Sequence, residues 1–112
     1  MKEREIRDYI NDLIESCEDI LEFTKGMSFE NFSADKKTVN AVIRCLEVIG
    51  EATKNLPVNF KLEYADIPWK QMAGMRDKLT HEYFGVDKQM VWQVVEKHIP
   101  HILPLLKNIS IN

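Results

Sequence analysis

Cysteine, glycine and proline are scarce in this chain, and each shortage excludes a class of protein. Two cysteines, Cys17 and Cys45, are too few for a zinc site, and the three histidines show no ligand spacing with them. We therefore expect two buried thiols in a reducing compartment, and neither a metal nor another cofactor. Four glycines and four prolines leave little room for disorder. A Gly-rich phosphate loop is absent, which argues against ATP binding by a P-loop.

Excess positive charge and long apolar runs are also lacking. Lysine and arginine number 15 against 18 acidic residues, a formal net charge of −3. Proteins that coat nucleic acids are normally basic, so any contact with RNA must use a local positive groove. Residues 1–5 hold no apolar core of a signal peptide, and no run approaches the length needed to span a membrane. We therefore expect a cytoplasmic protein that does not engage a membrane.

What the chain does have is a regular apolar pattern. Its 112 residues are 45% apolar, which predicts one domain, residues 1–112, with a core that needs no disulfide or metal. Apolar residues recur at intervals of three and four, which is typical of amphipathic helices. The pattern predicts helices at about residues 3–24, 36–55, 69–84 and 88–99, and a last one from Pro100 to about Asn108. Helices joined by short connections predict an all-α, up-and-down bundle of four to five helices.

The boundaries of these helices depend on particular residues. Asp35 or Ser33 can cap the second helix, and Asp87 can cap the fourth. Pro100 should kink the chain or restart a helix, because proline has no N–H to donate and clashes one turn back. We expect residues 25–34 to form a loop that Phe29 and Phe32 anchor to the core, and residues 56–68 to form an ordered loop that can include one short helical turn.

Most of the reactive chemistry is concentrated in residues 76–83. Within this stretch lie Arg76, Asp77, His81 and Tyr83, toward the C-terminal end of the third predicted helix, which Gly85 should stop. An arginine and a histidine together suit phosphate chemistry: a guanidinium grips phosphate oxygens bidentately, and an imidazole moves protons near neutral pH. No metal is required. The last turn of a helix favours a cationic imidazole, which would raise the pKa of His81 and help it act as a general acid.

The spacing within this stretch limits how one helix could use these side chains. An α-helix turns about 100° per residue, so Arg76 and Tyr83 lie within about 20° of each other, two turns apart. Arg76 and His81 lie about 140° apart on an ideal helix and cannot readily reach one substrate atom together. Either the helix unwinds near His81, or a second copy of the chain completes the site. Two-fold dimers are the commonest homo-oligomers and would place two such helices across one groove.

Structural interpretations of the same residues also stay open. Charged residues on a short helix are usually a solvated face, a lone helical histidine is more often structural, and Tyr83 could belong to the core. Asp77 could orient the Arg76 guanidinium or simply face solvent. In the second helix, Arg44 and Glu51 lie seven apart on one face, where they could support the site or pair with neighbours.

Three further residues carry alternatives of the same kind. Lys36 and Lys37 are most simply solvated charges at a helix start, although they could add to an RNA groove. Trp69, which follows Pro68, is expected to be a core anchor rather than a platform on which bases stack.

The order arginine, four residues, histidine, one residue, tyrosine, at Arg76, His81 and Tyr83, resembles the signature of HepT-type toxins in the HEPN superfamily. The surrounding residues resemble that family too, over nearly the whole chain; they are residues 41–44, 48–52, 67–69, 74–76 and 81–84.

The resemblance implies a homodimeric, HEPN-like helical toxin that cleaves RNA without a metal. It implies a type VII-like toxin–antitoxin pair, in which the partner is a minimal nucleotidyltransferase that neutralises the toxin by transferring AMP to Tyr83. Arg76 and His81 would be the catalytic pair, and Asp77 fits the polar residue that commonly follows the arginine. From their shared face of the second helix, and not from the resemblance, we expect supporting roles for Arg44 and Glu51. The alternative is a non-catalytic helical module that docks the nucleotidyltransferase, with Tyr83 as that enzyme's substrate.

Overall fold

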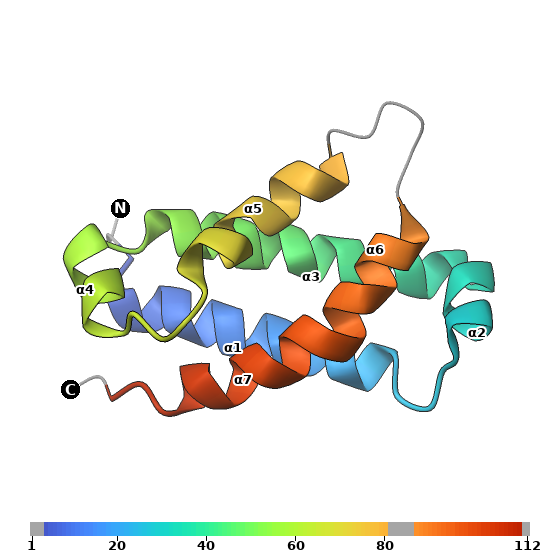
Figure 1. The fold of residues 1–112 in the computed structure, drawn as a ribbon, viewed down its shortest axis with the longest axis horizontal. Coiled ribbons are helices and arrows are strands. Elements are labelled where there is room, and N and C mark those ends of the chain that lie inside the picture. The colour runs from blue at the N-terminus through green and yellow to red at the C-terminus, as the bar shows by residue number, and fades with distance from the viewer. Residues whose placement is uncertain (1–3, 81–86, 111–112) are drawn as a thin grey trace.

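Four long helical segments run alternately in opposite directions through the molecule (Figure 1). The computed structural model describes residues 4–80 and 87–110, and for residues 76–80 it describes the backbone alone. The long segments are α1 (Ile6–Phe23), α3 (Lys36–Asn55), α5 (Trp69–Thr80) and a C-terminal segment made of α6 (Lys88–Gln93), η1 (Val94–His98) and α7 (Ile99–Lys107). Two short helices, α2 (Phe29–Ala34) and α4 (Val58–Glu63), lie at the connections. The prediction of an all-α, up-and-down bundle is confirmed.

Side-chain caps decide where three of the helices begin. The Asp35 carboxylate accepts hydrogen bonds from the backbone N–H of Thr38 at 3.1 Å and from its hydroxyl at 2.9 Å, so α3 starts at Lys36. Asp87 accepts from the N–H of Met90 at 3.1 Å and starts α6 in the same way. These bonds satisfy N–H groups that have no partner inside the helix. Of the two caps considered for α3, Asp35 is the one used.

The expectation of a loop over residues 25–34 is wrong for its second half, because α2 occupies Phe29–Ala34. The Ser28 hydroxyl accepts a hydrogen bond from the N–H of Asn31 at 3.1 Å, which closes the first turn. Phe32 is fully buried, with its ring centroid 5.0 Å from that of Trp92. Burial of this ring stabilises a helix too short to persist alone. The anchoring role expected of Phe32 is confirmed.

Pro100 does not break the C-terminal segment but is preceded by a π-helical turn. In η1 the N–H of Ile99 donates to the carbonyl of Val94, five residues back, instead of the usual four. Pro100 then falls in the first turn of α7, where no N–H donor is needed. The wider turn therefore accommodates the proline, and a helical segment continues from Lys88 to Lys107.

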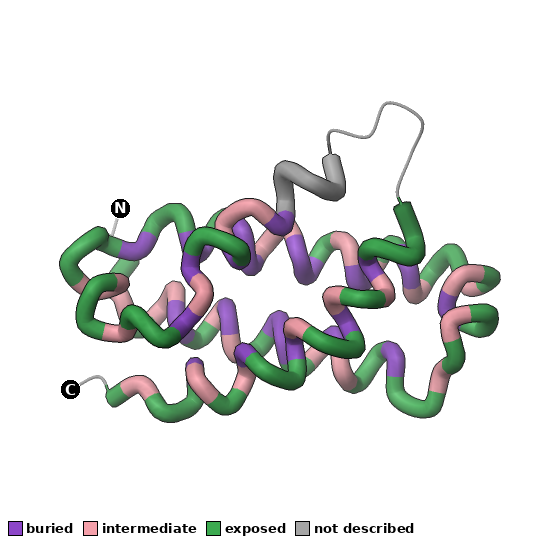
Figure 2. The backbone as a smooth tube through the Cα atoms, in the orientation of Figure 1, coloured by how far each residue is buried: buried purple, intermediate pink, exposed green. Residues whose placement is uncertain are grey.

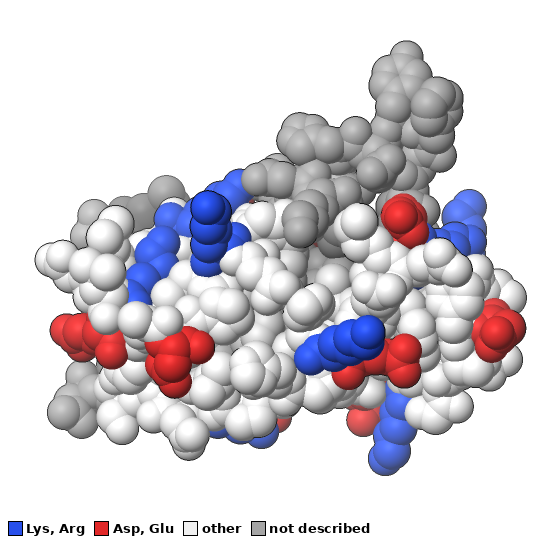
Figure 3. Space-filling model, in the orientation of Figure 1, with Lys and Arg blue, Asp and Glu red and all other residues white. Residues whose placement is uncertain are grey.

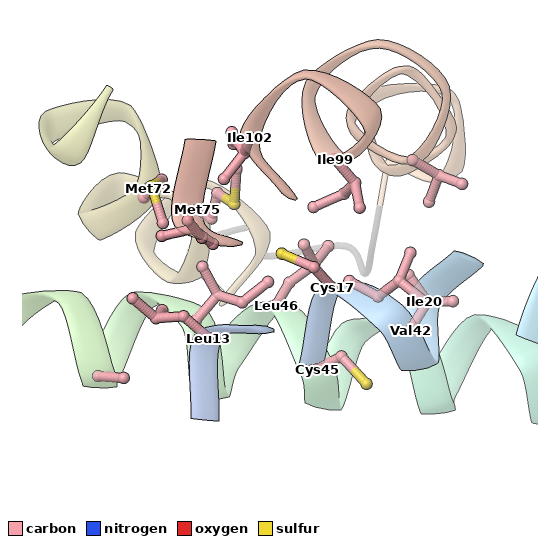
Figure 4. Packing of buried hydrophobic residues seen from close by; sticks show 14 of the residues in the cluster. Leu13, Cys17, Ile20, Val42, Cys45, Leu46, Met72, Met75, Ile99 and Ile102 are labelled. Atoms are coloured by element: carbon pink, nitrogen blue, oxygen red, sulfur yellow. The ribbon is translucent and has the colours of Figure 1, made fainter. Parts of the chain in front are cut away.

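The core lies where the inner faces of the long helices meet. Figure 2 shows buried residues recurring along α1 and α3 between exposed ones. In Figure 4, Leu13 and Cys17 of α1, Leu46 of α3, Met72 of α5 and Ile99 of α7 lie together. Apolar packing of this kind supplies most of the stability of a helical bundle.

Both cysteines are buried as free thiols, as expected. Burial raises the pKa of the Cys17 thiol to about 12 and that of Cys45 to about 11. Trp69 is also buried, and its indole N–H donates to the carbonyls of Lys61 at 3.1 Å and Tyr64 at 3.0 Å. It is a core anchor, as the sequence indicates, and ties α5 to α4.

Within residues 4–80 and 87–110, no helix is both long enough and apolar enough to cross a bilayer.

Candidate functional site

The arginine of the candidate motif lies in the second half of α5. This helix packs on α3 through Met72 and Met75, which are 0% and 4% exposed. Arg76 follows Met75 directly and lies one turn beyond Met72, at the flank of the buried face. Figure 1 shows α5 crossing over α3, with its C-terminal end rising from the bundle on the side where α6 begins. The structure therefore places the backbone of Arg76 and Asp77 at an edge of the bundle.

The other two motif residues, His81 and Tyr83, lie outside the described residues. So do the predicted last turn of the third helix, as far as Phe84, and its stop at Gly85. The catalytic and modification roles assigned to the motif remain predictions from sequence.

Arg44 and Glu51 share one face of α3, as their spacing predicts, and line the same groove between α1 and α3. The groove measures about 600 Å³, and its other lining residues include Arg4, Tyr9, Asp12 and Glu47. Arg4 pairs with Asp12, with Nη1 and Oδ2 2.8 Å apart, and its guanidinium lies 5.0 Å from the centroid of the Tyr9 ring. The hydrogen bond from Arg4 to Asp12 raises the pKa of Arg4.

Arg44 also lines a neighbouring groove in which carboxylates predominate. That groove, about 240 Å³, is bordered by Asp12, Glu15, Asp19, Ser16, Cys45 and Val48. Three acids around one arginine disfavour the approach of an RNA phosphate. We therefore interpret Arg44 as a residue that balances the negative charge of α1 rather than one that binds the substrate.

A third groove carries the opposite charge. It measures about 270 Å³ and lies where the end of α2, the first turns of α3 and the start of α6 meet; its lining residues are Ser33, Ala34, Lys36, Val39, Asn40, Ile43 and Lys88. The Nζ of Lys88 donates to the backbone carbonyl of Ser33 at 2.9 Å, 55 positions away in the sequence. Lys36 is a candidate for an RNA groove from the sequence alone, whereas Lys88 is not, because only the tertiary fold joins the two lysines.

The histidines outside the motif occupy ordinary positions. A ring nitrogen of His98 lies 3.3 Å from the Gln71 side-chain nitrogen and so links η1 to α5, while His101 is exposed on α7. In the part of the chain that the structure describes, no three His, Cys, Asp or Glu side chains gather as candidate metal ligands.

The chain is similar to proteins named as ribonucleases. It is 52% identical over 99 residues to a probable ribonuclease HepT of Thermococcus cleftensis, covering 88% of this chain and 90% of that protein. It is 45% identical over 109 residues to a candidate RNase of Methanocaldococcus jannaschii, covering 97% and 90% of the two chains. A candidate RNase of Caldanaerobacter subterraneus subsp. tengcongensis is 46% identical over 103 residues, 92% of each chain. No solved structure matches.

A family model described as ribonuclease HepT-like matches residues 13–109, which include the whole of the candidate motif. The resemblance drawn from Arg76, His81 and Tyr83 is thereby confirmed at the level of the family. This chain belongs to the ribonuclease HepT-like family.

Proposed function

We propose that this protein is a metal-independent endoribonuclease, the cytoplasmic toxin of a type VII-like toxin–antitoxin pair. One observation carries the proposal: the Arg76, His81 and Tyr83 pattern occurs, with the spacing complete, in a chain of the ribonuclease HepT-like family. The position of the C-terminal half of α5, which includes Arg76 and rises from the bundle (Figure 1), supports it, because an RNA strand needs an open approach to the reacting groups.

In the proposed reaction, the RNA supplies its own nucleophile. Arg76 grips the non-bridging oxygens of the scissile phosphate and offsets the negative charge that grows on them. The 2′-hydroxyl gives its proton to water as its oxygen attacks phosphorus, and the bond from phosphorus to the 5′-oxygen breaks. His81, protonated beforehand, gives its proton to that leaving oxygen. The products are a 2′,3′-cyclic phosphate and a 5′-hydroxyl.

Two copies of the chain would complete one site. On an ideal continuous helix, Arg76 and His81 would lie about 140° apart, so a single straight helix would not readily direct both at one phosphate. A two-fold dimer that sets two copies of α5 across a groove would bring the arginine and histidine of both copies to the same strand. This arrangement supports a composite site at the dimer interface.

Three other residues are proposed to support the site rather than to touch the reacting atoms. Asp77 would orient the Arg76 guanidinium from the next position of α5. Arg44 and Glu51, which line the groove between α1 and α3, would set the charge on the outer face of α3.

Neutralisation is proposed to act at Tyr83. The minimal nucleotidyltransferase partner would transfer AMP to its hydroxyl, which on an ideal helix would share a face with Arg76 two turns away. A bulky anion there would occupy the phosphate site and capture the guanidinium. The same modification would serve the docking-module alternative, which lacks a catalytic role for His81.

The choice of nucleic acid tests the chemistry. Purified, unmodified protein is incubated with an RNA strand and with DNA of the same sequence, each in the presence of a chelator. The proposal predicts cuts in RNA only, with cyclic phosphate ends, because DNA lacks the 2′-hydroxyl that attacks. Cleavage of the DNA strand, or loss of RNA cleavage on chelation, would refute the mechanism.

A further inference from the structure

An acidic chain that binds RNA has to confine the contact to a local concentration of positive charge. The formal charge of −3 repels a polyanion as a whole. Of the three grooves described above, the two beside α1 hold more carboxylates than cationic groups. The groove at α2, α3 and α6 holds Lys36 and Lys88, and no carboxylate of residues 4–80 or 87–110 is among its lining residues.

The lining of this basic groove suits a sugar–phosphate backbone. Ammonium groups bind phosphates as point charges, and the Asn40 amide can donate to phosphate or ribose oxygens. Val39 and Ile43 give the groove an apolar wall, against which a ribose can pack. Contacts of this kind to phosphate and ribose carry no sequence information, so most of the binding would not depend on the sequence of the RNA.

Lys88 is held in place before any ligand arrives. Its ammonium donates to the carbonyl of Ser33 at 2.9 Å, which uses one of its three hydrogens and leaves two for a phosphate. Fixing a long side chain in advance lowers the entropy that binding has to remove.

Two carboxylates lie next to these lysines in the sequence, but both are engaged in capping helices. Asp35 accepts from Thr38, and Asp87 accepts from the N–H of Met90. The hydrogen bonds from Thr38 lower the pKa of Asp35, so it stays charged. Among the described residues, the charged side chains that line the groove itself are both lysines, Lys36 and Lys88. Figure 3 shows lysine or arginine atoms near the start of α6, with acidic side chains also present at this end of the molecule.

The groove also lies close to the motif along the chain. Lys88 follows His81 by seven positions, and a fully extended chain spans about 3.6 Å per residue, so the two are at most about 25 Å apart. A strand bound at the motif could therefore continue into the groove.

We propose that Ser33, Lys36, Asn40 and Lys88 form a phosphate subsite for the RNA strand that flanks the scissile bond. This inference rests on the proposed function and extends it to the binding of substrate. The subsite contributes affinity and position, while the chemistry belongs to the motif.

The test measures RNA affinity across a salt series, in a His81→Ala background so that no RNA is cut. Each phosphate contact on single-stranded nucleic acid contributes about 0.7 to the slope of log affinity against log salt. The variant Lys36→Ala/Lys88→Ala should therefore lose about 1.4 from the slope and bind about tenfold more weakly at low salt. The matched control, Lys25→Ala/Lys97→Ala, removes the same charge from exposed positions outside the groove and should keep the slope.

A charge-preserving variant separates the subsite from the fold. Lys36→Arg/Lys88→Arg should restore most of the slope, because guanidinium also binds phosphate. If the Arg variant behaves like the Ala variant, or if the Ala variant keeps the slope of the control while active wild-type protein cuts RNA, the subsite is wrong and the proposed function stands. If the wild-type protein neither binds nor cuts RNA, both proposals fall together.

Discussion

The ring of Phe32 in α2 packs against that of Trp92 in α6, with centroids 5.0 Å apart and ring planes inclined at 34°. The contact joins residues that are far apart in the sequence and fastens the short helix α2 to the C-terminal segment. Ser33 follows Phe32, and Lys88 precedes Trp92 by one turn, so the same contact sets the spacing of the basic groove. Core packing and the proposed substrate contact are thus linked at this end of the bundle.

Removing the Phe32 ring should therefore weaken the fold strongly. Phe32 is 0% exposed, and truncation of a buried phenylalanine to alanine typically costs about 3–5 kcal/mol, because it removes apolar contacts and leaves a cavity. Chemical denaturation of Phe32→Ala measures the loss. Phe23, which is 42% exposed, supplies the control, and Phe23→Ala should change stability far less. Equal losses in the two variants would show that α2 does not belong to the cooperative core.

The Trp69 indole should contribute through its N–H as well as its packing. Trp69→Phe keeps most of the ring but removes this donor from the carbonyls of Lys61 and Tyr64, which still accept from the N–H groups of Tyr64 and Ile67, so we expect a cost of about 0.5–1.5 kcal/mol. Trp92→Phe is the matched change, since no described residue forms a hydrogen bond with the Trp92 indole N–H, and it should be milder. Unfolding curves of the two variants give the difference, and a Trp92→Phe loss as large as that of Trp69→Phe would contradict this account.

The buried Cys17 thiol should make stability fall in alkaline solution. Its pKa is raised from 9.0 to about 12 by burial, so between these values the folded chain holds a proton that the unfolded chain releases. The stabilisation that the protonated Cys17 thiol contributes is fully present below pH 9 and is lost as the pH rises toward 12. The free energy of unfolding, followed from pH 8 to 11, should decline less steeply in Cys17→Ala than in the parent. An equal decline in both would assign the effect to other groups.

Modification at Tyr83 is testable without a cleavage assay. Co-expression with the nucleotidyltransferase should add one AMP to the wild-type chain and none to Tyr83→Phe, as intact-mass spectrometry would show. Because the modification is proposed to block Arg76, Tyr83→Phe should also escape neutralisation and arrest growth. Tyr9→Phe, changed at a half-buried tyrosine of α1, should be modified and neutralised like the parent. AMP on the Tyr83→Phe chain would place the acceptor elsewhere.

Local signals in the sequence were enough to predict the long helices. Asp35 and Asp87 mark the starts of α3 and α6 because a cap acts on N–H groups only a few residues away. The shared face of Arg44 and Glu51 likewise follows from helical periodicity alone.

The features that were missed depend on distant residues. Helix α2 exists because Phe32 is buried against Trp92, and no pattern within residues 29–34 reports that contact. The π turn before Pro100 makes room for the proline ring while α7 stays packed on the core. The spacing of apolar residues does not predict such a turn. In the same way, the groove shared by Lys36 and Lys88 is a product of tertiary structure, whereas the motif was recognisable because its three residues lie in one short stretch.

The role of His81 is the central claim, and cleavage of total cellular RNA tests it most directly. Wild-type protein, His81→Ala and His101→Ala are compared at equal concentration, unmodified and with a chelator present. His101, exposed on α7, is the matched histidine. We predict that wild-type protein and His101→Ala cut RNA, while His81→Ala keeps its fold and cuts none. Undiminished cleavage by folded His81→Ala would contradict the account, and the absence of cleavage by all three proteins would favour the docking module.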